Sequence, residues 1–375
     1  MKLFTTIGSF FCALVAFSQT TIDHTLQHGG LTREYRLYIP ASYDGTESVP
    51  LLFNLHGYTS NNVQQEVYAD FRPIADTANF IIVHPNGTLD LGGNRYWNAF
   101  NIPGGVDDVG FLSTLIDEIS QSYTIDMNRV YSTGMSNGGF MSYELACALG
   151  YRITAVASVT GAMPKNRPST CNPPHPVPAM QIHGTADPTV PYNGNAQQES
   201  IEDVVDYWVG QTGCNPVPVV TQVPDVNTTD GCTAEQYVYS GGIGGATVEF
   251  FKIQGGGHTW PGAPIDIGVT NHDFDASVEI WRFFSKYKTT DLVSFEEQEE
   301  AVEFTLYPNP TEGNYTLGGA VETIRSVRVL DTSGKVIETY EGNAIPAELE
   351  IKQSGMYFVQ IETVVDTIIR KLIVR

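Results

Sequence analysis

Ser136 is the residue whose surroundings most clearly suggest chemistry. It lies in a G-x-S-x-G pentapeptide, Gly134-Met135-Ser136-Asn137-Gly138, with a strand-like run at 129–133 before it and a helix-like run at 140–149 after it. A sharp strand-to-helix turn of this kind exposes a nucleophilic serine, and its small neighbours let other backbone segments pass close to it. We therefore predict that Ser136 is a nucleophile. The alternative is that its hydroxyl only caps the following helix.

A nucleophilic serine needs a base and an acid that orients the base. After a serine turn of this kind, the acid and then the base follow along the chain. Asp187 follows a short apolar run, and His258 lies in a glycine-rich loop after another. Both lie beyond strand ends, where open α/β sheets place their sites. We predict that His258 is the base and Asp187 the acid; Asp203 and Asp206 are alternative acids, and His258 would otherwise be a structural loop residue.

The negative charge that develops during attack on a carbonyl requires two preorganised N–H donors. One is expected from the backbone N–H of Asn137, directly after the serine. The second is expected from the loop after an early strand, at Tyr58 or its neighbour Gly57. Two further histidines near these loops, His56 and His183, are interpreted as structural, with His56 stabilising the loop that supplies the second donor.

A metal site built from His183, Asp187 and His258 is a competing interpretation of these side chains. The chain has no H-E-x-x-H motif and no cysteine cluster of the kind that binds zinc. We therefore predict neither a metal nor another cofactor. Aromatic residues beside the candidate loops are predicted to stack on an aromatic acyl group or a sugar, packing being the alternative; they are Trp97, Tyr192 and Trp260.

The elements that must position these loops alternate between two patterns from about residue 22 to residue 287. Short apolar runs predict strands buried on both faces of a sheet, and they lie at 49–55, 80–83, 155–159 and 179–182. Helical periodicity lies between and after them, at 111–119, 201–209 and 276–287. This alternation predicts an α/β fold with a doubly wound, mostly parallel sheet and helices on both faces.

The composition changes after this region. An acidic stretch at 289–303 reads as a linker between two domains, at 19–288 and 304–375. The C-terminal domain contains short alternating strand patterns at 326–330, 356–361 and 367–369, separated by turn signals. These features predict a small all-β sandwich.

Charge and the N-terminal segment indicate the compartment. The formal net charge is −22 in 375 residues, which disfavours nucleic acid and anionic membrane surfaces as partners. Residues 1–18 read as a signal peptide, with Lys2, an apolar centre and a small-residue cleavage site that leaves Gln19 as the new N-terminus. No other segment is long and apolar enough to span a bilayer. We expect a secreted protein without a membrane span.

Four cysteines remain after the signal peptide is removed, namely Cys147, Cys171, Cys214 and Cys232. An even number in an exported protein suggests two disulfides. The sequence allows three pairings. We expect Cys147–Cys171 and Cys214–Cys232 because each closes a short local loop, with unpaired buried thiols as the alternative.

The region before the linker resembles a known family of secreted esterases. This family groups polyhydroxybutyrate depolymerases with feruloyl and acetyl-xylan esterases, within the α/β-hydrolase superfamily. The matching segments are Leu55–Gly57, His84–Gly87, Trp97-Asn98, Val106–Phe111, Gly134–Gly139, His183–Tyr192 and Gly257–Gly262. The resemblance implies Ser136 as nucleophile, Asp187 as acid and His258 as base. Family members often have Cys where this chain has Tyr58, so one disulfide or contact common there is absent.

The C-terminal domain resembles the sorting domain of the type IX secretion system. The segments that carry the likeness are Leu306–Pro310, Gly355–Tyr357 and Arg370–Val374. The resemblance implies export through a Gram-negative cell envelope by the type IX machinery, followed by removal of the domain or attachment to the cell surface. A carbohydrate- or polymer-binding module is the alternative.

Together these observations predict a secreted serine carboxylic-ester hydrolase that works through an acyl-enzyme. The expected substrate is a feruloyl or acetyl ester on a polysaccharide. Three alternatives remain: a polyhydroxybutyrate (polyester) depolymerase, a peptidase on the same scaffold, and a non-catalytic surface polysaccharide-binding protein that has kept a hydrolase scaffold.

Overall fold

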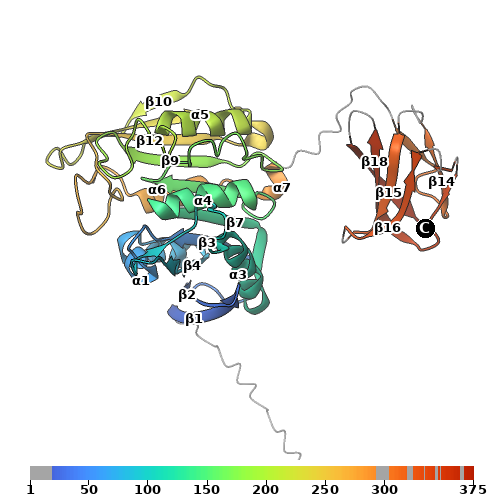
Figure 1. Ribbon diagram of the computed structural model, residues 1–375, viewed down its shortest axis with the longest axis horizontal. Helices are drawn as coiled ribbons and strands as arrows, with labels where there is room; N and C mark the ends of the chain where they lie inside the picture. The colour runs from blue at the N-terminus through green and yellow to red at the C-terminus, as the bar shows by residue number, and fades with distance from the viewer. Residues whose placement is uncertain are drawn as a thin grey trace, which may run out of the picture. The chain divides into compact units, whose positions relative to one another are not determined.

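The computed structural model describes residues 19–292, 304–318, 324–332, 334–342, 345–346, 348–363 and 367–375. These residues form two compact units, one before and one after the linker (Figure 1). The predicted signal peptide lies outside the described residues. Across the part of the chain that is described, no helix combines the length and the apolar character needed to cross a membrane.

The first unit is built on one ten-stranded sheet. Its spatial order is β1-β2-β4-β3-β7-β8-β9-β12-β11-β10. The six strands from β4 to β12 in that order pair in parallel, and the outer strands on each side are antiparallel. The strands are β1 (Thr20–His28), β2 (Leu31–Ile39), β3 (Val49–Leu55), β4 (Ile81–Pro85), β7 (Ile125–Met135), β8 (Ala155–Val159), β9 (Ala179–Gly184), β10 (Val219–Gln222), β11 (Thr233–Tyr239) and β12 (Val248–Gln254). The predicted mostly parallel sheet is confirmed.

Helices cover both faces of this sheet, as predicted. They are α1 (Asn62–Tyr68), α2 (Arg72–Ala78), α3 (Asp108–Ser122), α4 (Asn137–Ala148), α5 (Ile201–Thr212), α6 (Ala276–Phe284) and α7 (Thr289–Leu292), with a short 3-10 turn at Ile243–Gly245. A small hairpin, β5 (Thr88–Leu89) and β6 (Arg95–Tyr96), lies outside the sheet.

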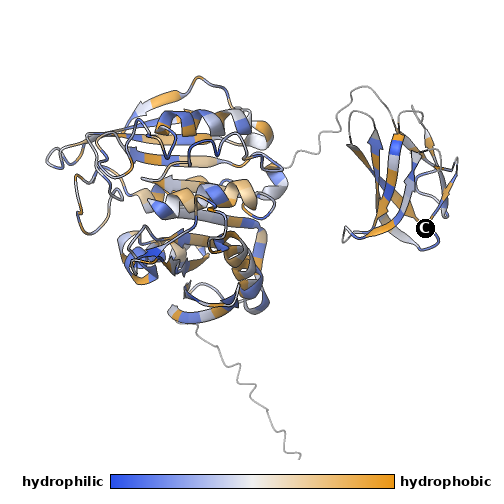
Figure 2. Cartoon of the chain, viewed as in Figure 1, coloured by the Kyte–Doolittle hydropathy of each residue, from blue (hydrophilic) through white to orange (hydrophobic). Residues whose placement is uncertain are grey.

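Alternation along the strands divides the core into two apolar clusters. In β3, Leu51 and Phe53 belong to the cluster that contains residues of α3, α4 and α5, whereas Leu52 belongs to the cluster that contains residues of α2 and α6. Strands buried on both faces need apolar residues at nearly every position, which explains the short apolar runs in the sequence. In Figure 2, apolar residues (orange) are prominent along the strands of both units.

The first unit extends slightly further than the sequence suggested. The predicted linker begins at residue 289, yet Thr289–Leu292 form α7. Leu292 is buried in the same apolar cluster as Tyr287. Burial of Leu292 explains why α7 belongs to the first unit although its neighbours in the sequence are polar.

The second unit consists of two antiparallel sheets. One contains β13 (Thr305–Tyr307), β14 (Asn314–Gly318) and β17 (Leu349–Glu350), and the other contains β16 (Val336–Glu341), β15 (Ile324–Leu330), β18 (Gly355–Thr363) and β19 (Thr367–Val374). Buried residues of both sheets, such as Leu306 and Val359, share one apolar cluster. The unit is therefore a small β-sandwich, as predicted.

The cysteines match the sequence prediction in one pair only. Cys147 and Cys171 form a disulfide, whereas Cys214 and Cys232 are free and buried, so the second predicted pair is wrong. The N–H of Asn215, the residue after Cys214, donates to the carbonyl of Ser240, which lies just beyond the C-terminal end of β11. Cys232, in contrast, directly precedes the first residue of β11. The seven residues of β11 therefore separate the two thiols. At about 3.3 Å per residue this separation far exceeds the roughly 7 Å between Cα atoms that a disulfide tolerates.

Candidate active site

Ser136 occupies the single residue between β7 and α4. Its backbone has φ 53° and ψ −117°, a conformation that non-glycine residues rarely adopt and that marks functional turns. The N–H of Ser136 donates to the carbonyl of Val159 (2.8 Å), and its own carbonyl accepts from the N–H of Phe140 (3.0 Å). The serine side chain makes no capping hydrogen bond to α4. The structure therefore does not support the alternative that the Ser136 hydroxyl only caps α4.

Two glycines beside the serine are required by close backbone packing. A Cβ placed on Gly138 would lie 2.1 Å from the carbonyl oxygen of Leu55, and one placed on Gly134 would lie 2.6 Å from the same oxygen. The end of β3 therefore runs directly against the turn. A Cβ on Gly57, two residues further along, would lie 3.5 Å from the Cβ of Ser136. The loop predicted to supply the second N–H donor thus lies beside the serine.

This loop is held in place through His56. Its Nε2 accepts from the backbone N–H of Gly87 (2.9 Å), its Nδ1 donates to the carbonyl of Gly57 (2.7 Å), and its carbonyl accepts from Nε1 of Trp97 (3.0 Å). Burial lowers the pKa of His56 to about 4, so the ring is neutral at physiological pH. These contacts agree with the interpretation of His56 as a structural residue of the loop.

The side chain of Asn137 adds a link that the sequence did not reveal. Its Oδ1 accepts from the backbone N–H of Trp97 (2.6 Å), and its Nδ2 donates to the carbonyl of the same residue (3.1 Å). The next residue, Asn98, donates its N–H to Asp108 (2.7 Å), which is paired with the buried Arg33 (2.6 Å). The only indication of this network in the sequence was that Trp97-Asn98 and Val106–Phe111, which contain some of its residues, match the esterase family.

Asp187 and His258 meet at one edge of the sheet. β9 and β12 are parallel neighbours, so the loops that follow them emerge at the same edge. Oδ2 of Asp187 lies 2.7 Å from Nδ1 of His258. The other oxygen accepts from the N–H groups of Thr189 (2.8 Å) and Val190 (2.9 Å). Burial raises the pKa of Asp187, but the hydrogen bond and charge of His258 outweigh it and hold the pKa below its usual value.

His183 supports the same carboxylate from the protein interior. It is fully buried, its Nε2 donates to the carbonyl of Val190 (2.9 Å) and lies 3.4 Å from Oδ2 of Asp187, and its Nδ1 accepts from Gln181 (3.1 Å). Burial lowers the pKa of His183 to about 4, so the ring remains neutral. Both ring nitrogens are used within the protein, which agrees with a structural role and not with a metal ligand.

The competing acids and the competing metal site receive no support from the geometry. Asp203 lies in α5, where it bonds the hydroxyl of Ser200 at the start of the helix (2.7 Å), and Asp206 lies one turn further along. Asp187, in contrast, is the carboxylate bonded to His258. Within the described ranges, no group of three or more His, Cys, Asp or Glu side chains is arranged to hold a metal ion.

Ser136 and His258 line one cleft of about 540 Å³. Its remaining walls are largely apolar and include Tyr58, Val63, Val67, Tyr68, Ile265 and Ile267. A second depression of about 290 Å³ is also lined by Tyr58, together with Tyr96, Trp97, Phe100, Ile102 and Asn137, among others. The apolar cleft residues on α1 and at 265–267 were not predicted, because single exposed apolar residues carry no recognisable sequence signal.

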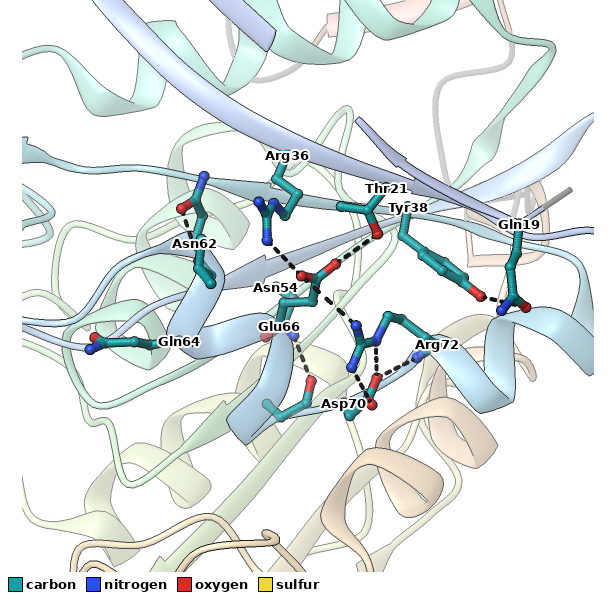
Figure 3. Close-up of polar contacts among 12 residues, drawn as sticks. Gln19, Thr21, Arg36, Tyr38, Asn54, Asn62, Gln64, Glu66, Asp70 and Arg72 are labelled. Carbon is teal, nitrogen blue, oxygen red and sulfur yellow. Dashed lines mark hydrogen bonds and ion pairs between the residues drawn. The ribbon is translucent and has the colours of Figure 1, made fainter. Parts of the chain in front are cut away.

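Helix α1, which supplies Val63 and Val67, is fixed to the edge of the sheet by a buried charge (Figure 3). Glu66 accepts from Nη1 of Arg36 on β2 (2.9 Å) and from the hydroxyl of Thr21 on β1 (3.2 Å). Because the carboxylate is buried, this pairing is needed to keep the wall of the cleft in place.

The three aromatic residues predicted to contact substrate lie in different places. Trp97 is 1% exposed and forms part of the wall of the smaller depression. Trp260 is also 1% exposed; its Nε1 donates to Ser277 (3.2 Å) and its backbone N–H to the hydroxyl of Tyr68 (3.2 Å). Trp260 therefore holds the cleft residue Tyr68 in place from the protein interior, and its burial argues against contact with substrate.

Tyr192 is also placed behind the site. Its hydroxyl donates to Glu202 (2.9 Å), and its ring packs edge-on against His183. It lines neither of the two depressions. The sequence indicated that all three aromatic residues lie near the candidate loops, but it could not show which way their side chains point.

Two family models match separate parts of the chain. The model described as phospholipase/carboxylesterase matches residues 107–208, which include Ser136 and Asp187. The model described as a secretion system C-terminal sorting domain matches residues 305–375. The two matches fall on the two units of the structure.

Individual proteins are similar over most of the first unit. A probable feruloyl esterase C of Aspergillus terreus is 30% identical over 292 residues, covering 75% of this chain and 95% of that protein. A bifunctional acetylxylan esterase/xylanase of Neocallimastix patriciarum is 26% identical over 275 residues, covering 73% of this chain but only 36% of that protein. The match therefore spans about a third of that longer relative.

Among solved structures, the acetyl xylan esterase from Aspergillus awamori superposes with a TM-score of 0.53 at 14% identity. The superposition covers 70% of this chain and 99% of that one. At this level of identity the likeness concerns the fold alone. It shows that the sheet and the helices of the first unit are those of an α/β-hydrolase.

Proposed function

We propose that this chain, which belongs to the feruloyl esterase C family, is a secreted serine ester hydrolase that cleaves feruloyl or acetyl esters on polysaccharides. One observation carries the proposal. The buried carboxylate of Asp187 lies 2.7 Å from Nδ1 of His258, and that histidine lines the same cleft as Ser136 on its strained turn. The named activities of the relatives support the substrate class.

In the proposed mechanism, Asp187 fixes the tautomer of His258. Because Nδ1 of His258 donates to the carboxylate, Nε2 is the nitrogen that accepts the proton of the Ser136 hydroxyl. The serine oxygen then attacks the ester carbonyl, and His258 returns the proton to the departing alcohol. Water repeats the sequence on the acyl-enzyme and releases the acid.

The backbone around Ser136 would stabilise the negative charge on the carbonyl oxygen. Asn137 is the first residue of α4, so its N–H has no partner inside the helix and lies at the positive end of the helix dipole. The N–H of Tyr58, or of its neighbour Gly57, would be the second donor. The hydrogen bonds of His56 and Trp97 hold this arrangement before substrate arrives.

The C-terminal unit supplies the route out of the cell. It is a secretion sorting domain, so the chain is exported to the cell surface or the medium. The partner of this unit would be the type IX machinery, and the partner of the first unit would be the ester. A secreted location suits a substrate that is part of an insoluble polymer.

The test is hydrolysis of p-nitrophenyl acetate and methyl ferulate by the full exported chain. The wild-type protein should cleave both, and Ser136→Ala should lower kcat at least about 10⁴-fold. A matched control is Ser169→Ala, an exposed serine whose hydroxyl bonds only to the backbone of its own turn; it should behave as wild type. Retention of more than a tenth of the rate in Ser136→Ala would contradict the serine mechanism, whereas a wild-type chain that cleaves neither ester would favour a non-catalytic binding protein.

A polyester depolymerase remains the second candidate because of one observation. Val63, Ile265 and Ile267, which line the cleft, are 45%, 58% and 61% exposed, and exposed apolar residues around a site suit contact with an apolar polymer. The two candidates differ in substrate preference. A higher kcat/KM on polyhydroxybutyrate particles than on methyl ferulate would reverse their order.

A further inference from the structure

Gln181 is an unusual residue for its position. It lies in the middle of β9, between Met180 and Ile182, and it is 1% exposed. All six residues of β9 are buried, and a central strand of this kind normally carries apolar side chains. A buried amide costs free energy unless its oxygen and its two N–H groups find partners. The partners of Gln181 therefore indicate what the residue does.

The orientation of this amide is fixed by two neighbours. One end lies 2.9 Å from the carbonyl oxygen of Gly161, which can only accept, so this end is the NH₂ group. The other end is then the oxygen, and it accepts from the hydroxyl of Tyr143 on α4 (2.6 Å). The donor end of Gln181 therefore points toward Gly161, and the oxygen points toward α4.

The second N–H of Gln181 decides which ring nitrogen of His183 carries the proton. The amide nitrogen lies 3.1 Å from Nδ1 of His183, and a donor facing this atom requires it to be unprotonated. Because the neutral ring has a single N–H, the proton lies on Nε2. The opposite edge of the ring agrees, since Nε2 lies 2.9 Å from the carbonyl oxygen of Val190, which needs a donor.

This tautomer matters because the same N–H also faces the carboxylate of Asp187. Nε2 of His183 lies 3.4 Å from Oδ2 of Asp187, the oxygen that is bonded to His258. Val190, whose carbonyl His183 binds, donates its own N–H to the other oxygen of Asp187 (2.9 Å). With the proton on Nδ1, a lone pair of His183 would face both the Val190 carbonyl and the carboxylate. The repulsion would displace Asp187 from His258.

We propose that Gln181 is a positioning residue of the active site: by donating to Nδ1, it holds His183 in the tautomer whose Nε2–H supports Asp187, which in turn orients His258. This inference rests on the proposed function, and it extends the acid–base machinery to a residue that lines no part of the cleft. Such a residue acts on geometry, because a small displacement of a catalytic group lowers the rate without weakening substrate binding.

Gly161 offers a second route from Gln181 to the chemistry. A Cβ on Gly161 would lie 2.8 Å from the carbonyl oxygen of Ser136, so the residue that Gln181 binds packs directly against the serine turn. Ser136, however, is already held by its backbone bonds to Val159 and Phe140. The structure therefore favours the route through His183, and substitution of His183 separates the two routes.

The first experiment compares two substitutions, in the full chain, that each break hydrogen bonds of the same buried amide. Gln181→Met keeps the approximate volume but removes the donor to His183. It should lower kcat on p-nitrophenyl acetate about tenfold and change KM less than twofold. Tyr143→Phe removes only the bond to the amide oxygen, so it should lower the thermal midpoint while kcat falls less than threefold. Equal losses of kcat in the two variants would overturn the inference.

A double variant separates positioning from stability. Tyr143→Phe combined with Gln181→Met replaces both partners of the 2.6 Å bond by apolar groups, which should restore part of the stability lost in Gln181→Met. Its kcat should remain about tenfold below wild type, because the donor to His183 is still absent. If kcat recovers together with the thermal midpoint, Gln181 is a structural residue and the inference is wrong.

A double-mutant cycle identifies the route. His183→Gln should itself lower kcat about tenfold, and adding Gln181→Met to it should cost less than a further twofold, since both substitutions remove the same support of Asp187. A further tenfold loss would assign the effect of Gln181 to Gly161 and the serine turn, and it would overturn the inference.

The tautomer itself can be observed by ¹⁵N NMR of the ring nitrogens of His183, assigned by their loss in His183→Gln. The wild-type ring should be protonated on Nε2, and in Gln181→Met, or in the double variant where Gln181→Met does not fold, the proton should shift towards Nδ1. A wild-type ring protonated on Nδ1, or an unchanged tautomer in the variant, would overturn the inference. This measurement needs no activity, whereas failure of the proposed function is a wild-type chain that cleaves neither p-nitrophenyl acetate nor methyl ferulate.

Discussion

The two sides of the candidate active site are built in different ways. On the serine side, Ser136 and the loop at Gly57 are positioned by close backbone packing, which glycines allow, and by neutral hydrogen bonds. In these bonds main-chain groups pair with one another or with the side chains of His56, Trp97 and Asn137. On the acid–base side, Asp187 and His258 are positioned by side chains, with a buried carboxylate that accepts from two backbone N–H groups and one imidazole. One side is therefore specified mainly by shape and the other mainly by charge.

This difference predicts how each side responds to substitution. On the serine side, the smallest added side chain meets a carbonyl oxygen 2.1 Å away at Gly138, so shape changes are costly whatever their polarity. On the acid–base side, a substitution can keep the shape of Asp187 and remove only its charge. Such an isosteric change should separate activity from stability.

The largest expected effect tests this separation directly. Asp187→Asn should lower kcat on p-nitrophenyl acetate by about 10⁴, because an amide at this position favours the wrong tautomer of His258. The amide oxygen can still accept from the N–H groups of Thr189 and Val190. The thermal midpoint should therefore change much less than the rate.

The control for this variant is Asp203→Asn, which changes a carboxylate in the first turn of α5. It should alter kcat by less than about threefold, since its partner is Ser200 and not His258. A loss of less than tenfold in Asp187→Asn would move the role of the acid to another residue and remove the distinction between the two sides.

The next effect concerns a feature that the two sides share. Each contains a buried neutral histidine, His56 on the serine side and His183 on the acid–base side, and burial lowers the pKa of both to about 4. A third buried histidine, His84 on β4, belongs to neither side, and burial lowers its pKa to about 3. In the unfolded chain these rings titrate near pH 6.5. Below that pH the unfolded state binds more protons than the folded state, so stability is lost as the pH falls from about 6.5 towards 4.

Each such ring contributes up to about 1.4 kcal/mol per pH unit to this loss, and three contribute about 4 kcal/mol per pH unit. Urea unfolding of the full chain between pH 7 and pH 4.5, followed through the first unit's tryptophan fluorescence, measures the slope. His56→Gln and His183→Gln should each reduce the slope by about a third. A slope unchanged by both substitutions would mean that the rings are accessible to protons in the folded state.

The parts of this architecture that could be predicted from sequence are those with a local cause. Strands buried on both faces produce short apolar runs, and a serine turn packed against a strand requires glycine, so Ser136 and the central sheet were recognisable. Asp187 and His258 could be selected as candidates because each lies in a loop directly after a predicted strand. Family resemblance strengthened these assignments and identified the sorting domain.

The features that were missed depend on contacts between distant segments. Whether Cys214 and Cys232 meet is decided by the length of β11 between them, which loop length does not reveal. The direction of the Trp260 side chain is decided by Ser277, a partner 17 residues away that is far from obvious in the sequence. The link between Asn137 and Trp97, 40 residues apart, joins the side-chain amide of Asn137 to backbone groups of Trp97, and such backbone partners have no sequence signature.

The smallest effect that we predict isolates one hydrogen bond on the serine side. Trp97→Phe removes the donor to the carbonyl of His56 (3.0 Å) but keeps an aromatic ring and both backbone bonds to Asn137. A buried carbonyl left without its partner costs about 1–3 kcal/mol. Because His56 positions the loop of Tyr58, kcat should also fall a few-fold.

The control is Trp208→Phe, a buried tryptophan of α5 whose Nε1 has no hydrogen-bond partner within the described part of the chain. Both substitutions shorten a buried indole to a benzene ring, so both create similar cavities. Only Trp97→Phe also breaks a hydrogen bond. The excess loss of stability and of kcat in Trp97→Phe therefore measures that bond, whereas equal losses in the two variants would show that packing alone, and not this hydrogen bond, fixes the serine side.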